Sequence, residues 1–136
     1  MTDFIMKYMV SISDINYGGH MGNDKSLALF HEARIGYLKS LGYSEMNIGE
    51  GLGIIMKDAH VDYLAEVFHG DELMVKVSLG EQKGPLFHLN YEVNRVSDAK
   101  MVFTGRTGIL AFDYEKRKVV RTPQVFFHKI KEHYGY

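Results

Sequence analysis

Hydrophobic and polar residues alternate along several stretches of the chain, which is the pattern of β-strands with one buried face. The first stretch covers residues 4–13, and a longer one covers residues 54–67. The clearest alternation follows in residues 73–79 and 87–93, and a mostly apolar stretch covers residues 101–114. The pattern therefore predicts five strands.

The period of two also predicts which side chains point inward. In the first strand the expected buried residues are Phe4, Met6, Tyr8, Val10 and Ile12. In the strand over residues 54–67 one face is expected to hold Ile55, Ala59, Val61, Tyr63, Ala65 and Val67. Gly105 and Gly108 in the last strand indicate a bulge or the close passage of another backbone.

Between the first two strands, residues 24–41 change to a period of three and four, which predicts one long helix. Its expected apolar stripe consists of Leu27, Phe30, Tyr37, Leu38 and Leu41, widened by Leu29, Ala33 and Ile35. Gly42 is typical of a helix end, and Pro123 begins a short second helix expected to pack on the outside. The order of elements predicts an α+β domain, residues 1–136, in which an antiparallel sheet wraps the long helix.

Composition narrows the functional classes. The chain has 136 residues, of which 46% are hydrophobic, so one domain can bury a substantial core. A net charge of -1 gives no basic field for a nucleic acid. No apolar run approaches the roughly 18 residues that a membrane span needs, and the first residues lack a signal-peptide pattern. We therefore expect a cytoplasmic protein with no nucleic-acid partner and no membrane span.

The residue types limit the chemistry. There is no cysteine, so disulfides, thiolate metal sites and thiol nucleophiles are excluded. No histidine or carboxylate pair has a recognised metal-ligand spacing, and neither a dinucleotide-binding nor a phosphate-loop motif is present. We expect no metal and no cofactor, and carboxylates, histidines and hydroxyls remain as the reactive groups.

The chemistry is expected at the glycine-rich turn of residues 14–24, which leads into the long helix. Its glycines, Gly18, Gly19 and Gly22, allow positive φ and leave little bulk over the turn. Asn23 or Asp24 is a good N-cap, and free N–H groups at the helix start can point at a ligand.

Several segments carry a family likeness. Residues 13–24 resemble an Asp-x-Asp-x-x-Gly-His-x-Asn-Asn signature, and residues 32–34 resemble the Glu-Ala-Arg helix segment that accompanies it. Residues 61–64 and 68–73, which include Gly70-Asp71, are similar to the second strand and turn of the same group. The chain thus resembles hotdog-fold acyl-CoA thioesterases of the 4-hydroxybenzoyl-CoA thioesterase-like group. The resemblance implies a long central helix wrapped by a five-stranded antiparallel sheet, and hydrolysis of an acyl thioester.

One position departs from that group. Asn16 replaces the second Asp of the signature, which is the usual nucleophile or general base. Asparagine can orient a water or donate to a carbonyl but cannot take up a proton near neutral pH. Asp24, where the group usually has a small apolar residue, is the leading replacement for this carboxylate, although an aspartate there can also serve only to stabilise the helix start.

The other candidate residues each have a second interpretation. His20 is a proton shuttle or a donor to the thioester, or else stabilises the turn. Glu32 lies on roughly the same helical face as Asp24 and is either catalytic or paired with Arg34, Arg106 or a partner chain. The backbone of Gly19, Gly22 and Asn23 is expected to bind the substrate, with the N–H groups of Gly22, Asn23 and Asp24 facing the oxyanion. Asp14 is expected to anchor the loop.

The expected partner is acyl-CoA or an acyl carrier protein, with an apolar acyl group beside Leu27, Phe30, Tyr37 and Met56. A non-catalytic acyl-thioester binding or regulatory protein is the alternative, and a hydratase is a third possibility. The long edge strand of residues 54–67 needs a partner, which predicts a homodimer or a dimer of dimers. Asp58, His60 and Asp62 of one chain would then line the slot of the other.

Overall fold

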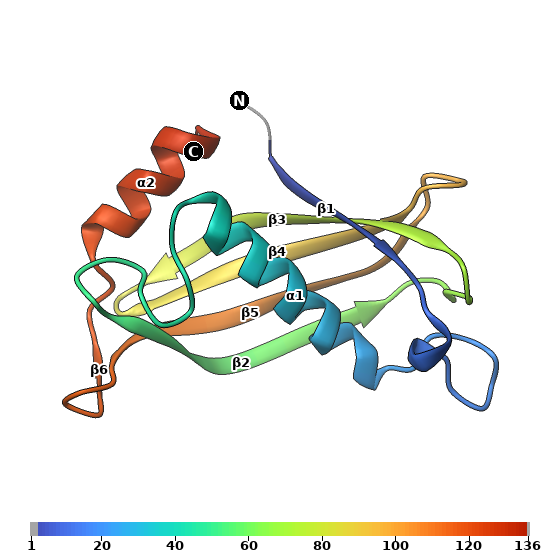
Figure 1. The fold of residues 1–136 in the computed structure, drawn as a ribbon, viewed down its shortest axis with the longest axis horizontal. Helices are drawn as coiled ribbons and strands as arrows, with labels where there is room; N and C mark the ends of the chain where they lie inside the picture. Colours follow the sequence, from blue (N-terminus) through green and yellow to red (C-terminus); the bar gives the residue numbers. More distant parts are fainter. Residues whose placement is uncertain (1–2, 136) are drawn as a thin grey trace.

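The computed structural model describes residues 3–135. In chain order the elements are β1 (Phe4–Met9), the 3₁₀ turn η1 (Ile12–Asp14), α1 (Asp24–Ser40), β2 (Gly53–Tyr63), β3 (Glu72–Lys83), β4 (Leu86–Arg95), β5 (Met101–Asp113), β6 (Lys118–Val120) and α2 (Gln124–Tyr134). The strands form one sheet in the order β1-β3-β4-β5-β2, with antiparallel neighbours. The expected α+β class is confirmed, and β2 lies at one edge of this order (Figure 1).

The sheet has six strands, so the expectation of five was wrong. The sixth strand, β6, is only three residues long and pairs with β5 through Ala111–Val120, Phe112–Val119 and Asp113–Lys118. A segment of three residues is too short to show a period of two, which is why the alternation did not separate it from the end of the preceding strand.

The first strand is shorter than the alternation suggested. It ends at Met9, and the chain turns into η1, which leaves Ile12 70% exposed instead of buried. The amide of Val10 donates to the carbonyl of Asp71, and Asp14 accepts from the amide of Ser11. These bonds turn the backbone out of the sheet and toward the glycine-rich loop.

A β-bulge in β2 changes which residues face inward. Met56 pairs with Ile109 and Asp58 pairs with Gly108, so Lys57 is the extra residue. One inserted residue exchanges the two faces of a strand. Ile54 is therefore buried on one side of the bulge, whereas Val61 packs against the core on the other. The expected inward face, which placed Ile55 with Val61, was wrong before the bulge, and beyond it Ala59 and Tyr63 are exposed. The strand also ends at Tyr63, not at Val67.

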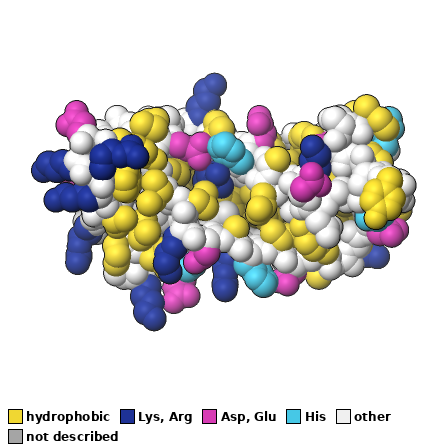
Figure 2. Space-filling view, turned by 90° about the horizontal axis from the view of Figure 1, so that it is seen from below, with side chains coloured by type: hydrophobic (Ala, Val, Ile, Leu, Met, Phe, Trp, Pro, Cys, Tyr) yellow, Lys and Arg dark blue, Asp and Glu magenta, His cyan; other side chains and the backbone are white. Residues whose placement is uncertain are grey.

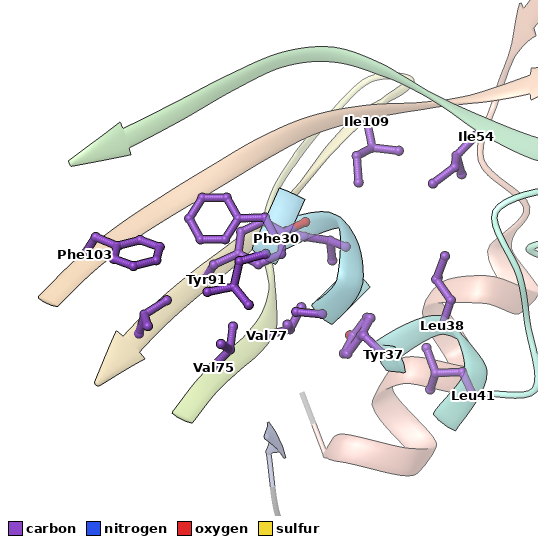
Figure 3. Packing of buried hydrophobic residues seen from close by; sticks show 14 of the residues in the cluster. Phe30, Tyr37, Leu38, Leu41, Ile54, Val75, Val77, Tyr91, Phe103 and Ile109 are labelled. Carbon is purple, nitrogen blue, oxygen red and sulfur yellow. The ribbon is translucent and has the colours of Figure 1, made fainter. Parts of the chain in front are cut away.

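Helix α1 runs diagonally across one face of the sheet (Figure 1). Near its middle Phe30 stacks on Tyr91 of β4 with a centroid distance of 4.3 Å and contacts Phe103 of β5 at 5.7 Å (Figure 3). Gly105 of β5 makes this possible, because a Cβ there would lie 2.3 Å from the Phe30 ring and 2.8 Å from the carbonyl oxygen of His60. The predicted close approach at this glycine is therefore mainly that of an aromatic side chain.

The predicted apolar stripe of α1 is mostly buried, but Leu27 and Ile35 are about half exposed. Ile35 points away from the side that holds Phe30, at 100° per residue, and Leu27 belongs to the first turn. The C-terminal helix α2 is amphipathic, as expected, with one face buried and the other exposed. Phe126 and Ile130 are fully buried, and Phe126 contacts Phe87 of β4 at 5.3 Å, so α2 completes the core.

Candidate functional site

The glycine-rich turn is a small closed loop. Ile15 and Met21 form an isolated antiparallel bridge, and the amide of Asn16 donates to the carbonyl of His20 at 3.0 Å. The side chain of Asn16 accepts from the amide of Gly18 through Oδ1 at 2.9 Å, while Gly19 takes a φ of 81°. Asn16 therefore holds the turn with its oxygen, and no hydrogen bond of its NH₂ group is found among the described residues.

The start of α1 differs from the expectation in two ways. The amide of Gly22 donates to the carbonyl of Asp14 at 2.9 Å, so it is not free to hold an oxyanion. Asn23, at the N-cap position, has helical dihedrals and makes no side-chain capping bond. Within the described residues no hydrogen bond from the amides of Asn23 and Asp24 is found. Two of the three expected amides thus remain available to a ligand.

Gly22 does not take a positive φ, and two polar side chains approach it. A Cβ at this position would lie 2.6 Å from Oδ1 of Asp24 and 3.7 Å from Cβ of Asn16. The exposed Asp24 carboxylate and the Asn16 side chain therefore both lie against Gly22. The sequence separates these two polar side chains by eight residues, and the turn brings them together at the helix start.

A hollow of about 290 Å³ opens beside this point. Its polar side includes His20, Gly22 and Asn23, and the Nδ1 of His20 lies 3.2 Å from the carbonyl oxygen of Met21. Its apolar wall comes from the segment after β2 and from β5, and comprises Leu64, Ala65, Val67 and Phe103. The residues expected to line an acyl slot do not do so: Phe30 and Tyr37 are fully buried in the core, and Leu27 and Met56 are exposed elsewhere.

Two hydroxyls in the hollow were missed from the sequence. Tyr63, at the end of β2, donates to the carbonyl of Asn23 at 2.8 Å, and its oxygen lies 2.7 Å from Oγ of Ser26. Ser26 also donates to the Asn23 carbonyl at 2.8 Å. The spacing of Asn23 and Ser26 is typical of a Ser that bonds one turn back and could have been noticed. The contact with Tyr63 joins residues 37 positions apart, which no local pattern indicates.

Glu32 does not share a site with Asp24. It lines a second hollow together with Tyr8, Asp14 and Lys25, more than two helical turns from the start of α1. Of the three partners considered for Glu32, Arg34 is instead buried and donates to Glu45 at 3.0 Å. The expectation from helical spacing did not take into account the length of helix between Asp24 and Glu32.

Asp14 has the contacts of a loop anchor. Its buried carboxylate accepts from the phenol of Tyr8 at 2.5 Å, the amide of Ser11 at 2.9 Å and the hydroxyl of Ser11 at 3.2 Å. Burial by itself raises the pKa of Asp14, but the hydrogen bonds from Tyr8 and Ser11 outweigh it, so the pKa lies below its ordinary value. Asp14 is consequently a fixed anion that ties β1 to the turn.

The polar residues of β2 lie away from the hollow. Asp58, His60 and Asp62 are exposed, and the ring of His60 lies 3.1 Å from Asp62. Asp58 fills the space over Gly108, where a Cβ would come within 2.4 Å of its carboxylate. Across residues 3–135 no group of three or more possible ligands is placed to hold a metal ion. None of the helices described there is both long and apolar enough to cross a membrane.

Residues 10–130 match the model of the family described as the thioesterase-like superfamily. An acyl-CoA thioesterase, YbgC, from Haemophilus influenzae is 26% identical over 133 residues, which cover 94% of this chain and 96% of the relative.

Solved structures show the same fold. A 1,4-dihydroxy-2-naphthoyl-CoA thioesterase from Synechocystis superposes with a TM-score of 0.83 at 23% identity, covering 95% of this chain and 96% of the other. A Staphylococcus aureus protein solved in complex with CoA superposes with a TM-score of 0.85 at 19% identity, covering 98% of this chain and 84% of the other. At these identities the structural likeness shows the fold alone.

Proposed function

The chain belongs to the thioesterase-like superfamily, and from this premise we propose that it hydrolyses acyl-CoA thioesters to a free carboxylic acid and a thiol. The observation that supports the proposal most is the start of α1, where the amides of Asn23 and Asp24 have no partner among the described residues and Asn23 borders a hollow with an apolar wall. A thioester needs these two features: donors for its carbonyl oxygen and a dry slot for its acyl group.

In the proposed reaction the carbonyl oxygen accepts hydrogen bonds from the amides of Asn23 and Asp24. Asp24 takes a proton from a water molecule whose oxygen adds to the carbonyl carbon. The NH₂ group of Asn16, whose Cβ lies near the same Gly22, orients that water. The tetrahedral intermediate then reforms its C=O bond as the C–S bond breaks, and the sulfur leaves as the thiol after receiving the proton. We assign the passage of this proton to His20, which lines the hollow.

The proposal names the substrate only by its chemical class. The named relatives act on CoA thioesters, so we propose acyl-CoA before an acyl carrier protein. The wall of Leu64, Ala65, Val67 and Phe103 favours an apolar acyl group. The alternative is an acyl-thioester binding protein without catalysis, and Asn16 is the observation in its favour, because the position holds no proton acceptor.

Release of thiol from a panel of acyl-CoAs of different chain length, together with an aromatic acyl-CoA, tests the proposal. Turnover of at least one member well above the spontaneous rate is expected, and it should fall in Asp24→Asn. Glu50→Gln, an exposed carboxylate in the loop before β2, serves as a control that should leave the rate unchanged. Tight binding of acyl-CoA without thiol release would support the binding protein instead.

We also propose that β2 joins the same strand of a second copy, giving a homodimer or a dimer of dimers. Support comes from its place at the sheet edge and from the exposed apolar side chains Met56, Tyr63 and Leu64 on and beside it. Figure 2, which views the molecule from below, shows such hydrophobic side chains between charged ones. An exposed edge of eleven residues invites pairing with another chain. Asp58, His60 and Asp62 would then lie beside the interface. Light scattering at micromolar concentration should give twice or four times the monomer mass, and a monomer would contradict the pairing.

A further inference from the structure

A second hollow, of about 270 Å³, lies between β1 and the first half of α1, and the reaction above assigns it no part. Met21 lines both this hollow and the first one, so the two hollows adjoin at this side chain. Lys25, which directly follows Asp24 in the chain, also lines the second hollow. The second hollow therefore begins beside the start of α1, where the thioester is proposed to react.

One oxygen of the buried Asp14 carboxylate is unpartnered in this hollow. The phenol of Tyr8, the amide of Ser11 and the hydroxyl of Ser11 all donate to Oδ2. No hydrogen bond to Oδ1 is found within residues 3–135, and this atom is not among the fully enclosed ones that lack a partner. Asp14 is only 8% exposed and lines the second hollow. Its Oδ1 is therefore a fixed acceptor that a ligand in this hollow can use.

Lys25 supplies a donor near this acceptor. Burial raises the pKa of Asp14, the hydrogen bonds from Tyr8 and Ser11 lower it, and the charge of Lys25 lowers it further. No ion pair joins Lys25 to Asp14 in the part of the chain that the structure describes. The ammonium and the carboxylate thus lie close enough to interact without being in contact, and a ligand group can bridge them.

The chemistry of this pair indicates a neutral amide as the group between them. An amide has one N–H donor and one C=O acceptor, so it can donate to Oδ1 of Asp14 and accept from Lys25. An ammonium group has no acceptor for Lys25, and a carboxylate has no donor for Asp14. The lining also includes Met6, Ala28 and Leu29, whose apolar side chains suit short methylene segments on either side of an amide.

We propose that the second hollow binds the pantetheine arm that carries the acyl group, with the amide nearest to the sulfur between Asp14 and Lys25. The inference rests on the proposed hydrolysis. Two methylene groups separate the sulfur of this arm from its first amide, and two more separate the first amide from the second. The hollow continues along α1 to Glu32, about 10 Å beyond Lys25 at 1.5 Å per residue, so the second amide also has room.

Three thioesters of the same acyl group test this assignment. The thioester of pantetheine has both amides, that of N-acetylcysteamine has only the first, and that of ethanethiol has none. Lys25→Met removes the ammonium and keeps a chain of similar length. With the first two thioesters KM should rise about 5- to 20-fold at unchanged kcat, because the lost bond is equal in the substrate and the transition state. With the ethanethiol thioester KM should stay within about twofold.

A rise in KM for all three thioesters would mean that Lys25 acts independently of the amide, and this would overturn the inference. Lys39→Met is the matched control, because Lys39 lies in the last turn of the same helix and lines neither hollow. It should change KM for none of the three.

A second variant fills the hollow without removing a charge. Ala28 is exposed on α1, so Ala28→Phe adds a ring at the hollow and leaves the core unchanged. KM for the pantetheine thioester should rise about 10-fold or more, and KM for the ethanethiol thioester should stay unchanged. Ile35→Phe, at an exposed position of α1 outside both hollows, is its control. An unchanged KM for the pantetheine thioester in Ala28→Phe would overturn the inference.

Acyl-CoA and an acyl carrier protein share this arm, so Ala28→Phe should lower kcat/KM for both when they carry the same acyl group. A loss with acyl-CoA alone would assign the hollow to the nucleotide of CoA instead of the arm, and would overturn the inference.

The outcomes for the two proposals are distinguishable. If the wild type hydrolyses acyl-CoA and both Lys25→Met and Ala28→Phe keep its KM, the arm site is refuted and the hydrolysis stands. If the wild type releases no thiol, calorimetry with pantetheine decides. Binding that is lost in Ala28→Phe and kept in Ile35→Phe would leave the arm site standing and the hydrolysis refuted. If the wild type neither releases thiol nor binds pantetheine, both are refuted.

Discussion

Gly105 offers a quantitative test of how α1 is seated on the sheet. A methyl group at this position would lie 2.3 Å from Cε2 of Phe30 and 2.8 Å from the backbone oxygen of His60. Neither neighbour can move freely, because the Phe30 ring is fully buried and stacked on Tyr91 and the His60 oxygen belongs to the paired strand β2. The free energy of unfolding of Gly105→Ala should therefore fall by about 1–3 kcal/mol, the usual effect of overpacking a core.

Thermal unfolding followed by circular dichroism measures this effect. A loss of 1 kcal/mol lowers Tm by roughly 2–8 °C across domains of about 60 to 250 residues, so the expected change is well above error. Gly108→Ala is the matched control in the same strand. The three atoms nearest to its methyl group would all belong to the carboxylate of Asp58, which is exposed and can turn away, so its Tm should stay close to that of the wild type.

A second substitution identifies the Phe30 ring as the cause. Phe30→Leu alone should destabilise the protein, because it removes ring contacts with Tyr91 and Phe103. Combined with Gly105→Ala, it should cost less than the sum of the two single changes, because the smaller side chain makes room for the methyl group. An unchanged Tm for Gly105→Ala, or simple additivity in the double variant, would refute the seating of α1 described here.

Two further predictions concern carboxylates. Asp24→Asn should lower kcat by about 10²–10⁴-fold while acyl-CoA binding changes only a few-fold, and a wild-type rate in this variant would exclude Asp24 as the base. Asn16→Asp should retain or raise the activity, because it restores a carboxylate beside Gly22. The second prediction concerns acid stability. The pKa of Asp14 in the folded protein lies below the ordinary 3.8. The ionised carboxylate therefore stabilises the fold above pH 3.8, and this stabilisation is lost as the pH falls through the folded-state pKa. Tyr8→Phe removes a hydrogen bond that lowers this pKa, so urea unfolding between about pH 4 and 2 should show a weaker loss of stability with falling pH than in the exposed control Tyr17→Phe.

The parts of the fold that alternation could predict are those in which the backbone is regular. Strands β3 and β4 bury Leu73, Val75, Leu89 and Val93 as the period of two indicates. The bulge at Lys57 was not predicted, because a bulge depends on pairing with another strand. Here Met56 and Asp58 pair with the consecutive residues Ile109 and Gly108 of β5. A period read along one strand contains no information about its partner.

The candidate site was predictable to a similar degree. Its place, at the glycine-rich turn before α1, followed from local features: Gly19 does take a positive φ, and the amides of Asn23 and Asp24 have no partner in the part of the chain that the structure describes. The residues that approach from other elements were not predictable in this way. Gly22 donates to Asp14 across the loop, and Tyr63 reaches Ser26 from the end of β2.

The position of Asn16 illustrates what the structure adds to a motif. From the sequence, an asparagine in place of a carboxylate indicates either lost chemistry or chemistry moved to another residue. In the structure Oδ1 of Asn16 is occupied by the amide of Gly18, and its remaining NH₂ group can only donate. A donor cannot replace a base, but it can orient a water for one, and Asp24 lies against the same glycine. A donor near an exposed carboxylate is what the proposal of moved chemistry requires, and the rates of Asp24→Asn and Asn16→Asp decide between moved and lost chemistry.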